Sequence, residues 1–109
     1  DCDIEFAGCA EIVGDTDALN PQYLGPWNRP RANPILIVNS RHDPATPLHD
    51  AQATARQLGD GRVLVVDGFG HTTLDVHSAC ASAALTRYFV DLTTPTDGTV
   101  CAPDFTPFP

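Results

Sequence analysis

Two short runs of consecutive apolar residues constrain the fold of this chain more than any other feature. Ile35–Val38 and Val63–Val66 show no alternation with polar residues. Such runs are typical of strands buried on both faces of a parallel sheet. A stretch with helical periodicity separates them, and the order strand, helix, strand predicts a right-handed βαβ unit. We therefore expect an α/β fold in which Ile35–Val38 forms a central strand.

The helices of this fold are predicted from periodicity and from end signals. The first is expected to begin with Thr46 as its N-cap and Pro47 at its first helical position, and to end at Gly59. Its apolar positions are Leu48, Ala51, Ala55 and Leu58. A second helix, capped by Ser78, is expected to pack on the sheet. Its apolar stripe is Cys80, Ala84, Tyr88 and Leu92, widened by Leu85 and Phe89.

The two ends of the chain are predicted to be less regular than its middle. Residues 1–33 contain a turn-prone stretch and are expected to be an irregular, partly helical connector. Residues 34–109 are expected to form the α/β segment. Four prolines follow Thr93 in this segment and predict an extended tail without regular structure.

An aspartate and a histidine follow the two predicted strands and are the candidate catalytic residues. Asp43 lies a few residues after the first strand, and His71 follows the second, 28 residues further along the chain. The carboxyl ends of parallel strands meet at one edge of a sheet, so both side chains should lie close together. A carboxylate beside an imidazole fixes its tautomer and stabilises the imidazolium that forms when it accepts a proton. Gly68 and Gly70 allow the tight backbone turn that orients the side chain of His71.

Each of these residues also has a structural interpretation. Asp43 precedes Pro44, and aspartate is common in turns. A histidine in a glycine-containing loop is often an ordinary surface residue. The pairing of the two loops favours the catalytic interpretation over both alternatives.

A nucleophile cannot be assigned from the sequence. The three serines are Ser40, Ser78 and Ser82, and none lies in a GxSxG motif at a turn from strand to helix. A metal site is also disfavoured, because the imidazole and carboxylate residues match no known ligand spacing. Those residues are His42, Asp43, His49, His71, Asp75 and His77. We expect neither a metal nor a cofactor.

The cysteines indicate an oxidising environment. The chain has four cysteines and no CxxC motif, so disulfides are expected. We favour Cys80 with Cys101 and Cys2 with Cys9, because each pair closes a local loop. This predicts a secreted, extracellular protein, with buried free thiols in a cytosolic protein as the alternative.

The charge of the chain excludes two classes of partner. Fourteen acidic residues against six basic ones give a formal charge of −8, which repels nucleic acid and anionic membranes. No apolar run approaches the length that spans a bilayer.

Four segments together resemble the C-terminal region of the secreted tripeptidyl-aminopeptidase-like α/β-hydrolases. They are PILIVNS running into RHDPATPLHDA, then VLVVDGFGHTT, the helix with Cys80 followed by RYFVD, and TPTDGTVCAPD with Cys101. The resemblance extends from about Pro34 to Pro109. It implies that Asp43 is the acid and His71 the histidine of a Ser-Asp-His triad. It also implies a serine peptidase that releases short peptides from a free N-terminus.

α/β-Hydrolases place their triad in the order serine, acid, histidine, and this chain carries the last two. We therefore expect a C-terminal fragment or processed chain that is inactive alone. The serine and oxyanion hole are expected on an N-terminal chain or segment of the same enzyme, and the substrate is expected to be a peptide or a small amide or ester. The alternatives are an esterase or other amide hydrolase, or a non-catalytic binding or structural module with a vestigial Asp–His pair.

Overall fold

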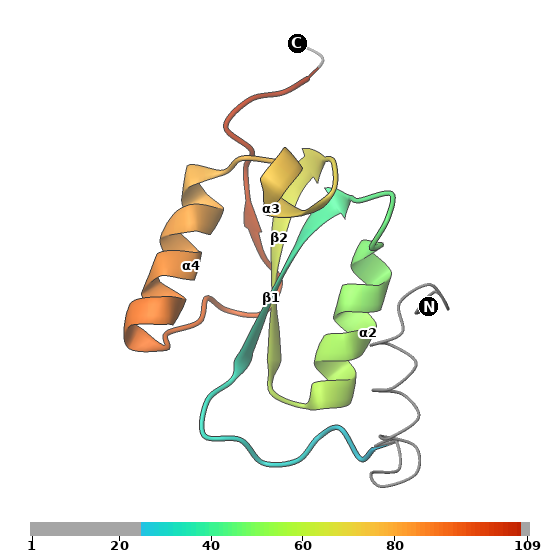
Figure 1. Cartoon of the computed structure of the whole chain (residues 1–109), viewed down its shortest axis with the longest axis vertical. Helices are drawn as coiled ribbons and strands as arrows, with labels where there is room; N and C mark the ends of the chain where they lie inside the picture. The colour runs from blue at the N-terminus through green and yellow to red at the C-terminus, as the bar shows by residue number, and fades with distance from the viewer. Residues whose placement is uncertain (1–24, 108–109) are drawn as a thin grey trace, which may run out of the picture.

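A three-stranded parallel sheet forms the centre of the fold (Figure 1). The structure is a computed structural model and describes residues 25–107. The strands are β1 (Ile35–His42), β2 (Gly61–Phe69) and β3 (Thr99–Cys101), in the order β1-β2-β3. Cys2, Cys9 and most of the predicted connector lie outside the described residues. The α/β fold class is confirmed, because helices flank a parallel sheet.

The predicted βαβ unit is present and includes helix α2 (Leu48–Leu58) between β1 and β2. The two strands pair in parallel from Ile35 opposite Gly61 to Ser40 opposite Val66. The expectation of a central strand at Ile35–Val38 is wrong for the described residues, because β2 lies between β1 and β3. The side chains of Ile35–Val38 are only half buried, whereas Val63–Val66 are fully buried.

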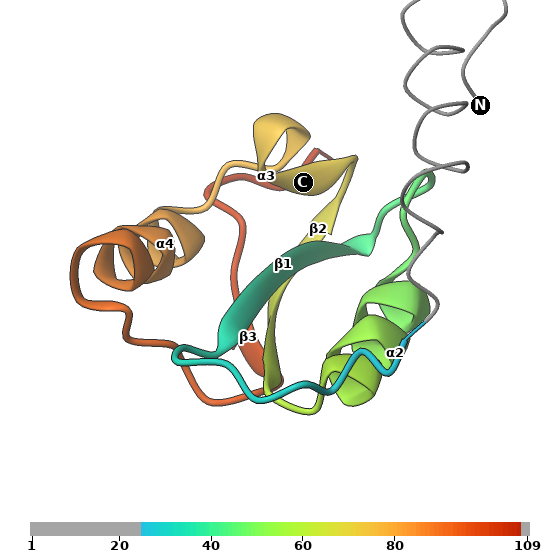
Figure 2. The same ribbon diagram turned by 60° about the horizontal axis from the view of Figure 1, so that its bottom comes forward.

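Helices cover the two faces of the sheet, as Figure 2 shows. On one face, Ala55 of α2 packs with Val63 and Val65. On the other face, Leu64 and Val66 pack with residues of helix α4 (Ala79–Asp91). Successive strand residues point to opposite faces, so an unbroken apolar run supplies both cores.

The structure confirms some of the predicted helix ends and corrects others. Helix α2 begins at Leu48 with Pro47 at the N-cap, and Thr46 does not cap it. Gly59 ends the helix, as expected, with a positive φ of 82° that favours glycine. Ser78 caps α4 by accepting a hydrogen bond from the Ala81 N–H. Ala84 lies on the buried face of α4 as predicted, together with Ala81. Three members of the predicted stripe, Cys80, Phe89 and Leu92, are exposed.

The prediction that the tail lacks regular structure is wrong, because β3 pairs with β2. Asp97 and Gly98 start this pairing: the Asp97 carboxylate accepts from the Val63 N–H, and the Gly98 N–H donates to the Val63 carbonyl. Cys101, at the end of β3, forms a disulfide with Cys80 at the start of α4. A short helix, α3 (Thr72–Asp75), which was not predicted, follows β2. Within residues 25–107, no helix has the length and apolar character needed to cross a bilayer.

Candidate active site

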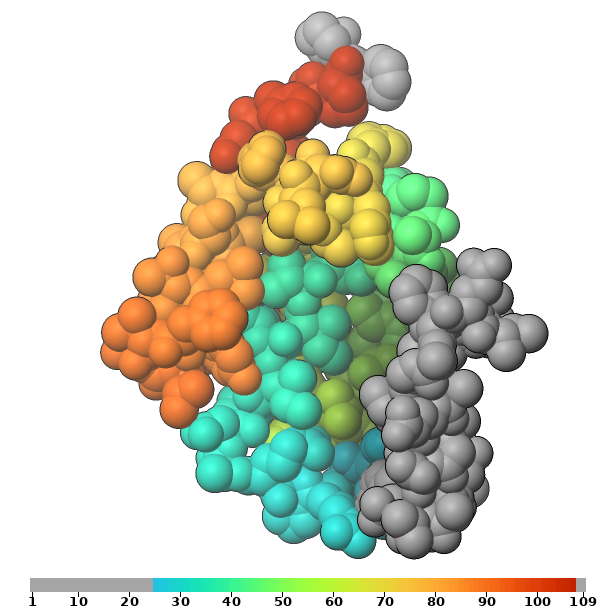
Figure 3. Space-filling view, in the orientation of Figure 1, coloured from blue at the N-terminus to red at the C-terminus, as the bar shows by residue number. Residues whose placement is uncertain are grey.

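The candidate site lies at the carboxyl ends of β1 and β2. Asp43 follows β1 directly, and His71 comes two residues after β2. The pairing register shifts between Ser40 and His42, so that His42 lies opposite Phe69. The imidazole of His42 stacks on Phe69 with ring centroids 4.3 Å apart. Both loops therefore leave the same end of the sheet, and the α3 turn lies at the surface of this end (Figure 3).

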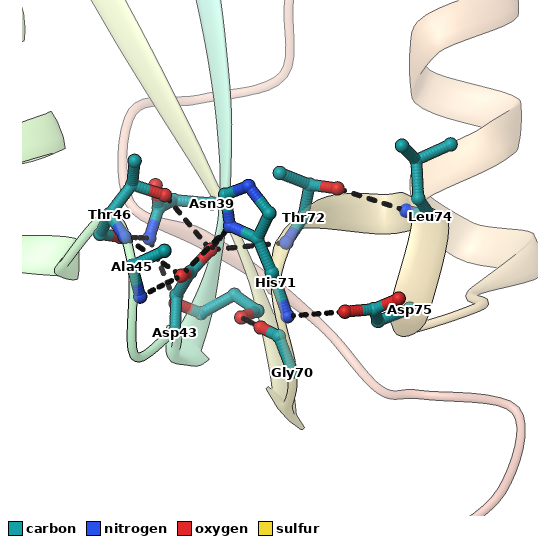
Figure 4. A network of polar contacts seen from close by, with 10 residues as sticks. Asn39, Asp43, Ala45, Thr46, Gly70, His71, Thr72, Leu74 and Asp75 are labelled. Atoms are coloured by element: carbon teal, nitrogen blue, oxygen red, sulfur yellow. Dashed lines mark hydrogen bonds and ion pairs between the residues drawn. The ribbon is translucent and has the colours of Figure 1, made fainter.

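The side chains of His71 and Asp43 are in direct contact (Figure 4). Nδ1 of His71 lies 3.0 Å from Oδ1 and 3.0 Å from Oδ2 of Asp43. A carboxylate can only accept hydrogen bonds, so Nδ1 carries the proton and Nε2 is left as the basic nitrogen. The second ring nitrogen points away from Asp43. The Asp43 side chain is 0% exposed and that of His71 is 45% exposed, so the acid is shielded while the base is open to a reactant.

Four further hydrogen bonds hold the Asp43 carboxylate. Oδ1 accepts from the backbone N–H of Ala45 at 2.9 Å and of Thr46 at 2.8 Å. Oδ2 accepts from the Thr46 hydroxyl at 2.9 Å and from the Thr72 N–H at 3.1 Å. Hydrogen bonds to an ionised acceptor are stronger than those between neutral groups, so this arrangement fixes the plane of the carboxylate.

The same contacts determine the ionisation of Asp43. Burial favours the neutral acid and by itself would raise the pKa of Asp43. The backbone hydrogen bonds from Thr46 and Ala45, the contact with His71 and the Thr72 N–H together outweigh burial and hold this pKa well below its ordinary value. Asp43 is therefore a carboxylate at neutral pH, able to stabilise an adjacent imidazolium.

The loop that carries His71 has a constrained backbone. Gly70 has φ +144° and Thr72 has φ +59°, a left-handed value that β-branched residues rarely adopt. This conformation aims the Thr72 N–H at Asp43, and the Thr72 hydroxyl accepts from the Leu74 N–H at 3.2 Å. The His71 N–H donates to the Asp75 carboxylate at 3.1 Å.

Gly68 has a different role from the one predicted. Its φ is not positive, but a Cβ at this position would lie 2.4 Å from Cγ1 of Val76. Gly68 therefore allows the segment after α3 to pack closely on β2.

The sequence pattern predicts both members of the pair but not the residues that hold the Asp43 carboxylate. It predicts Thr46 as a helix cap and gives no role to Thr72. The DPAT sequence does carry a local signal, because an aspartate often accepts hydrogen bonds from the residues that follow it. No comparable local signal indicates the contact from Thr72, which lies 29 residues away.

Other polar residues near the site already have partners. The Ser40 hydroxyl donates to the Gly70 carbonyl, and the Ser78 hydroxyl donates to the carbonyl of Ala102. Arg41 forms an ion pair with Asp67 at 2.6 Å. Among residues 25–107, no three side chains of the metal-binding types lie close enough together to hold a metal ion.

The parallel sheet, with an acid and a histidine at its carboxyl end, defines the C-terminal part of an α/β-hydrolase. The chain belongs to the family described as TAP-like protein, whose match covers residues 4–101.

Two similar proteins are known from Mycobacterium tuberculosis. Carboxylesterase B is 38% identical over 72 residues, which are 66% of this chain and 14% of that protein. Serine protease Hip1 is 37% identical over 68 residues, which are 62% of this chain and 13% of that protein. This chain therefore corresponds to only a small part of the length of these relatives.

Proposed function

We propose that this chain supplies the acid and the histidine of a serine hydrolase. The observation that carries the proposal is the contact between Nδ1 of His71 and the buried Asp43 carboxylate. The four additional donors keep Asp43 ionised and oriented toward His71, as the acid of a triad requires. Membership of the TAP-like family and relatives named as a carboxylesterase and a serine protease support the same function.

In the proposed mechanism, Nε2 of His71 removes the proton of a serine hydroxyl as its oxygen attacks the substrate carbonyl. Asp43 stabilises the resulting imidazolium, which then protonates the leaving group. Water then hydrolyses the ester bond of the acyl-enzyme, and His71 again acts as the base. Asp43 keeps its charge throughout, in agreement with its lowered pKa.

We propose that the serine and the oxyanion hole belong to an N-terminal segment of the same enzyme. Ser40 and Ser78 are buried and donate to backbone carbonyls, and Ser82 lies within helix α4. None of them follows a strand in the tight turn that presents a nucleophile. The aligned region amounts to 14% of Carboxylesterase B, which leaves most of such a protein for the nucleophile.

The proposed reaction is removal of short peptides from a free N-terminus, that is, exopeptidase activity. The resemblance to the tripeptidyl-aminopeptidase-like enzymes supports it. Ester hydrolysis is the second candidate, because one relative is named a carboxylesterase. Both reactions use the same acyl-transfer chemistry, so the Asp43–His71 pair serves either.

We further propose an extracellular location. The Cys80–Cys101 disulfide joins α4 to β3, and disulfides persist mainly in oxidising compartments.

The test uses the complete protein with its N-terminal segment. A serine-directed fluorophosphonate is applied, and the labelled peptide is identified by mass spectrometry. We expect one labelled serine, within GxSxG and outside residues 1–109, and loss of labelling in His71→Ala. Labelling that persists in His71→Ala would refute the triad.

A substrate panel then separates the two reactions. It contains a tripeptide anilide with a free amine, the same anilide N-acetylated, and a short-chain ester. Exopeptidase function predicts that acetylation abolishes cleavage of the anilide. Efficient ester hydrolysis with no anilide cleavage would favour the esterase.

A further inference from the structure

We infer that Thr46 is a positioning residue for the triad, an inference that rests on the proposed function. Its side-chain hydroxyl holds Oδ2 of Asp43 at 2.9 Å and so sets the orientation in which the carboxylate meets His71. Thr46 acts through Asp43 and does not contact the imidazole in any hydrogen bond of the site.

The two carboxylate oxygens are held in different ways. Oδ1 is held by two backbone N–H groups, which nearly any residues at positions 45 and 46 would supply. Oδ2 is held by the Thr46 hydroxyl and by one backbone N–H, that of Thr72. Rotation about the Cβ–Cγ bond moves both oxygens together, so contacts on either oxygen oppose it. The Thr46 hydroxyl is the one of these four contacts that depends on a side chain, and so it is the one that substitution can remove without changing the backbone.

The hydroxyl has no competing role in the helix. Pro47 occupies the N-cap of α2, and no side-chain hydrogen bond caps this helix. The hydrogen bond of the Thr46 hydroxyl is made to Asp43. This distinguishes Thr46 from Ser78, whose hydroxyl does cap a helix.

Thr46 is itself held in place. Its carbonyl accepts from Nδ2 of Asn39 at 3.0 Å, and the same amide donates to the Ser40 carbonyl at 2.9 Å. Asn39 is buried within β1. The β-branched side chain of Thr46 has few χ1 choices, so fixing its backbone also fixes its hydroxyl. A continuous set of contacts thus links β1 to the Asp43 carboxylate (Figure 4).

The test compares Thr46→Val, which keeps the shape, with Thr46→Ser, which keeps the hydroxyl, in the complete protein. Loss of a hydrogen bond to a charged group predicts that Thr46→Val lowers kcat about 10- to 100-fold. KM should change by less than about twofold, because the contact acts in the transition state. Thr46→Ser should recover most of kcat. Rates are expressed per active site titrated with the fluorophosphonate.

The matched control is Thr54→Val. The Thr54 hydroxyl also donates at 2.8 Å, but to the Asp50 carbonyl on the exposed side of α2. The kcat of Thr54→Val should stay within about twofold of the wild-type value. If Thr46→Val does not fold, Thr46→Ala removes the hydroxyl without adding bulk and takes its place.

Proton NMR reports on the hydrogen bond between His71 and Asp43, which would not change if Thr46 had only a structural role. The proton between His71 Nδ1 and Asp43 should resonate downfield of the amide region. This resonance should shift or broaden in Thr46→Val, return in Thr46→Ser and be unchanged in Thr54→Val. Wild-type kcat together with an unchanged resonance in Thr46→Val would overturn the inference.

Asp43→Asn, measured in the same series, distinguishes a failure of the role of Thr46 from a failure of the proposed function. If Asp43→Asn is inactive while Thr46→Val behaves as wild type, only the role of Thr46 fails. If Asp43→Asn retains near-wild-type activity, the proposed function itself fails.

Discussion

Replacing Asp43 by asparagine should disable the histidine while leaving the loop nearly unchanged in shape. Oδ1 accepts from two backbone N–H groups, so the amide oxygen must occupy the Oδ1 position. The amide NH₂ then takes the place of Oδ2, beside Nδ1 of His71. An NH₂ group donates, so Nδ1 must become the acceptor and the ring proton moves to Nε2.

The magnitude of this effect follows from the altered tautomer. With its proton on Nε2, His71 cannot accept a proton from the serine, and the charge that stabilises the imidazolium is lost. A change of this kind lowers kcat on the order of 10⁴-fold. The NH₂ group also faces the Thr72 N–H, a donor that then loses its acceptor, so some loss of stability should accompany the loss of rate. The Thr46 hydroxyl can rotate and accept from the NH₂ group instead.

The assay is steady-state hydrolysis by the complete protein, normalised to folded protein by circular dichroism. Asp67→Asn is the matched control: Asp67 lies at the same end of β2 and is ion-paired with Arg41, but its side chain is 53% exposed. Asp67→Asn should keep kcat within about threefold of the wild type. A decrease of less than about tenfold in Asp43→Asn would refute the assignment of Asp43 as the triad acid.

Three further predictions concern stability and pH. Gly68→Ala places a Cβ 2.4 Å from Cγ1 of Val76. It should lower the free energy of unfolding, measured in urea, by about 1–3 kcal/mol. An unchanged urea midpoint would show that the segment after α3 moves aside without cost. Replacing Cys80 and Cys101 together by alanine removes a crosslink between residues 21 apart and should cost about 3 kcal/mol in the same assay, whereas no loss would show that the β2–β3 pairing suffices. The lowered pKa of Asp43 contributes stability that is present above its ordinary value of 3.8 and is lost as the pH falls below it. The unfolding free energy of the wild type should therefore fall more steeply between about pH 4 and pH 2 than that of Asp43→Asn, and equal slopes would contradict the pKa assignment.

The sequence predicts the framework of the site well because that framework depends on local pattern. Ile35–Val38 and Val63–Val66 are apolar at every position, and a sheet packed on both faces covers the side chains at every position of such a strand. The proximity of Asp43 and His71 follows from parallel pairing of those strands, since both loops then leave the same end of the sheet.

The features that were missed depend on contacts between distant segments. β3 has only three residues and lies in a proline-containing tail, so its strand character comes from pairing with β2 rather than from propensity. Helical spacing places the α4 stripe on the correct face but makes it too wide. Ala84 is buried, and Leu85 and Tyr88 are half buried. The exposed members are Phe89, Leu92 and Cys80, which forms the disulfide.

The most direct test of the account is the structure of the complete protein with a phosphonate bound covalently to its nucleophile. The modified residue should be a serine from outside residues 1–109. Its Oγ should lie about 3 Å from Nε2 of His71, with Nδ1 still in contact with Asp43. A modified serine more than about 6 Å from Nε2, or one paired with a different histidine, would contradict the account.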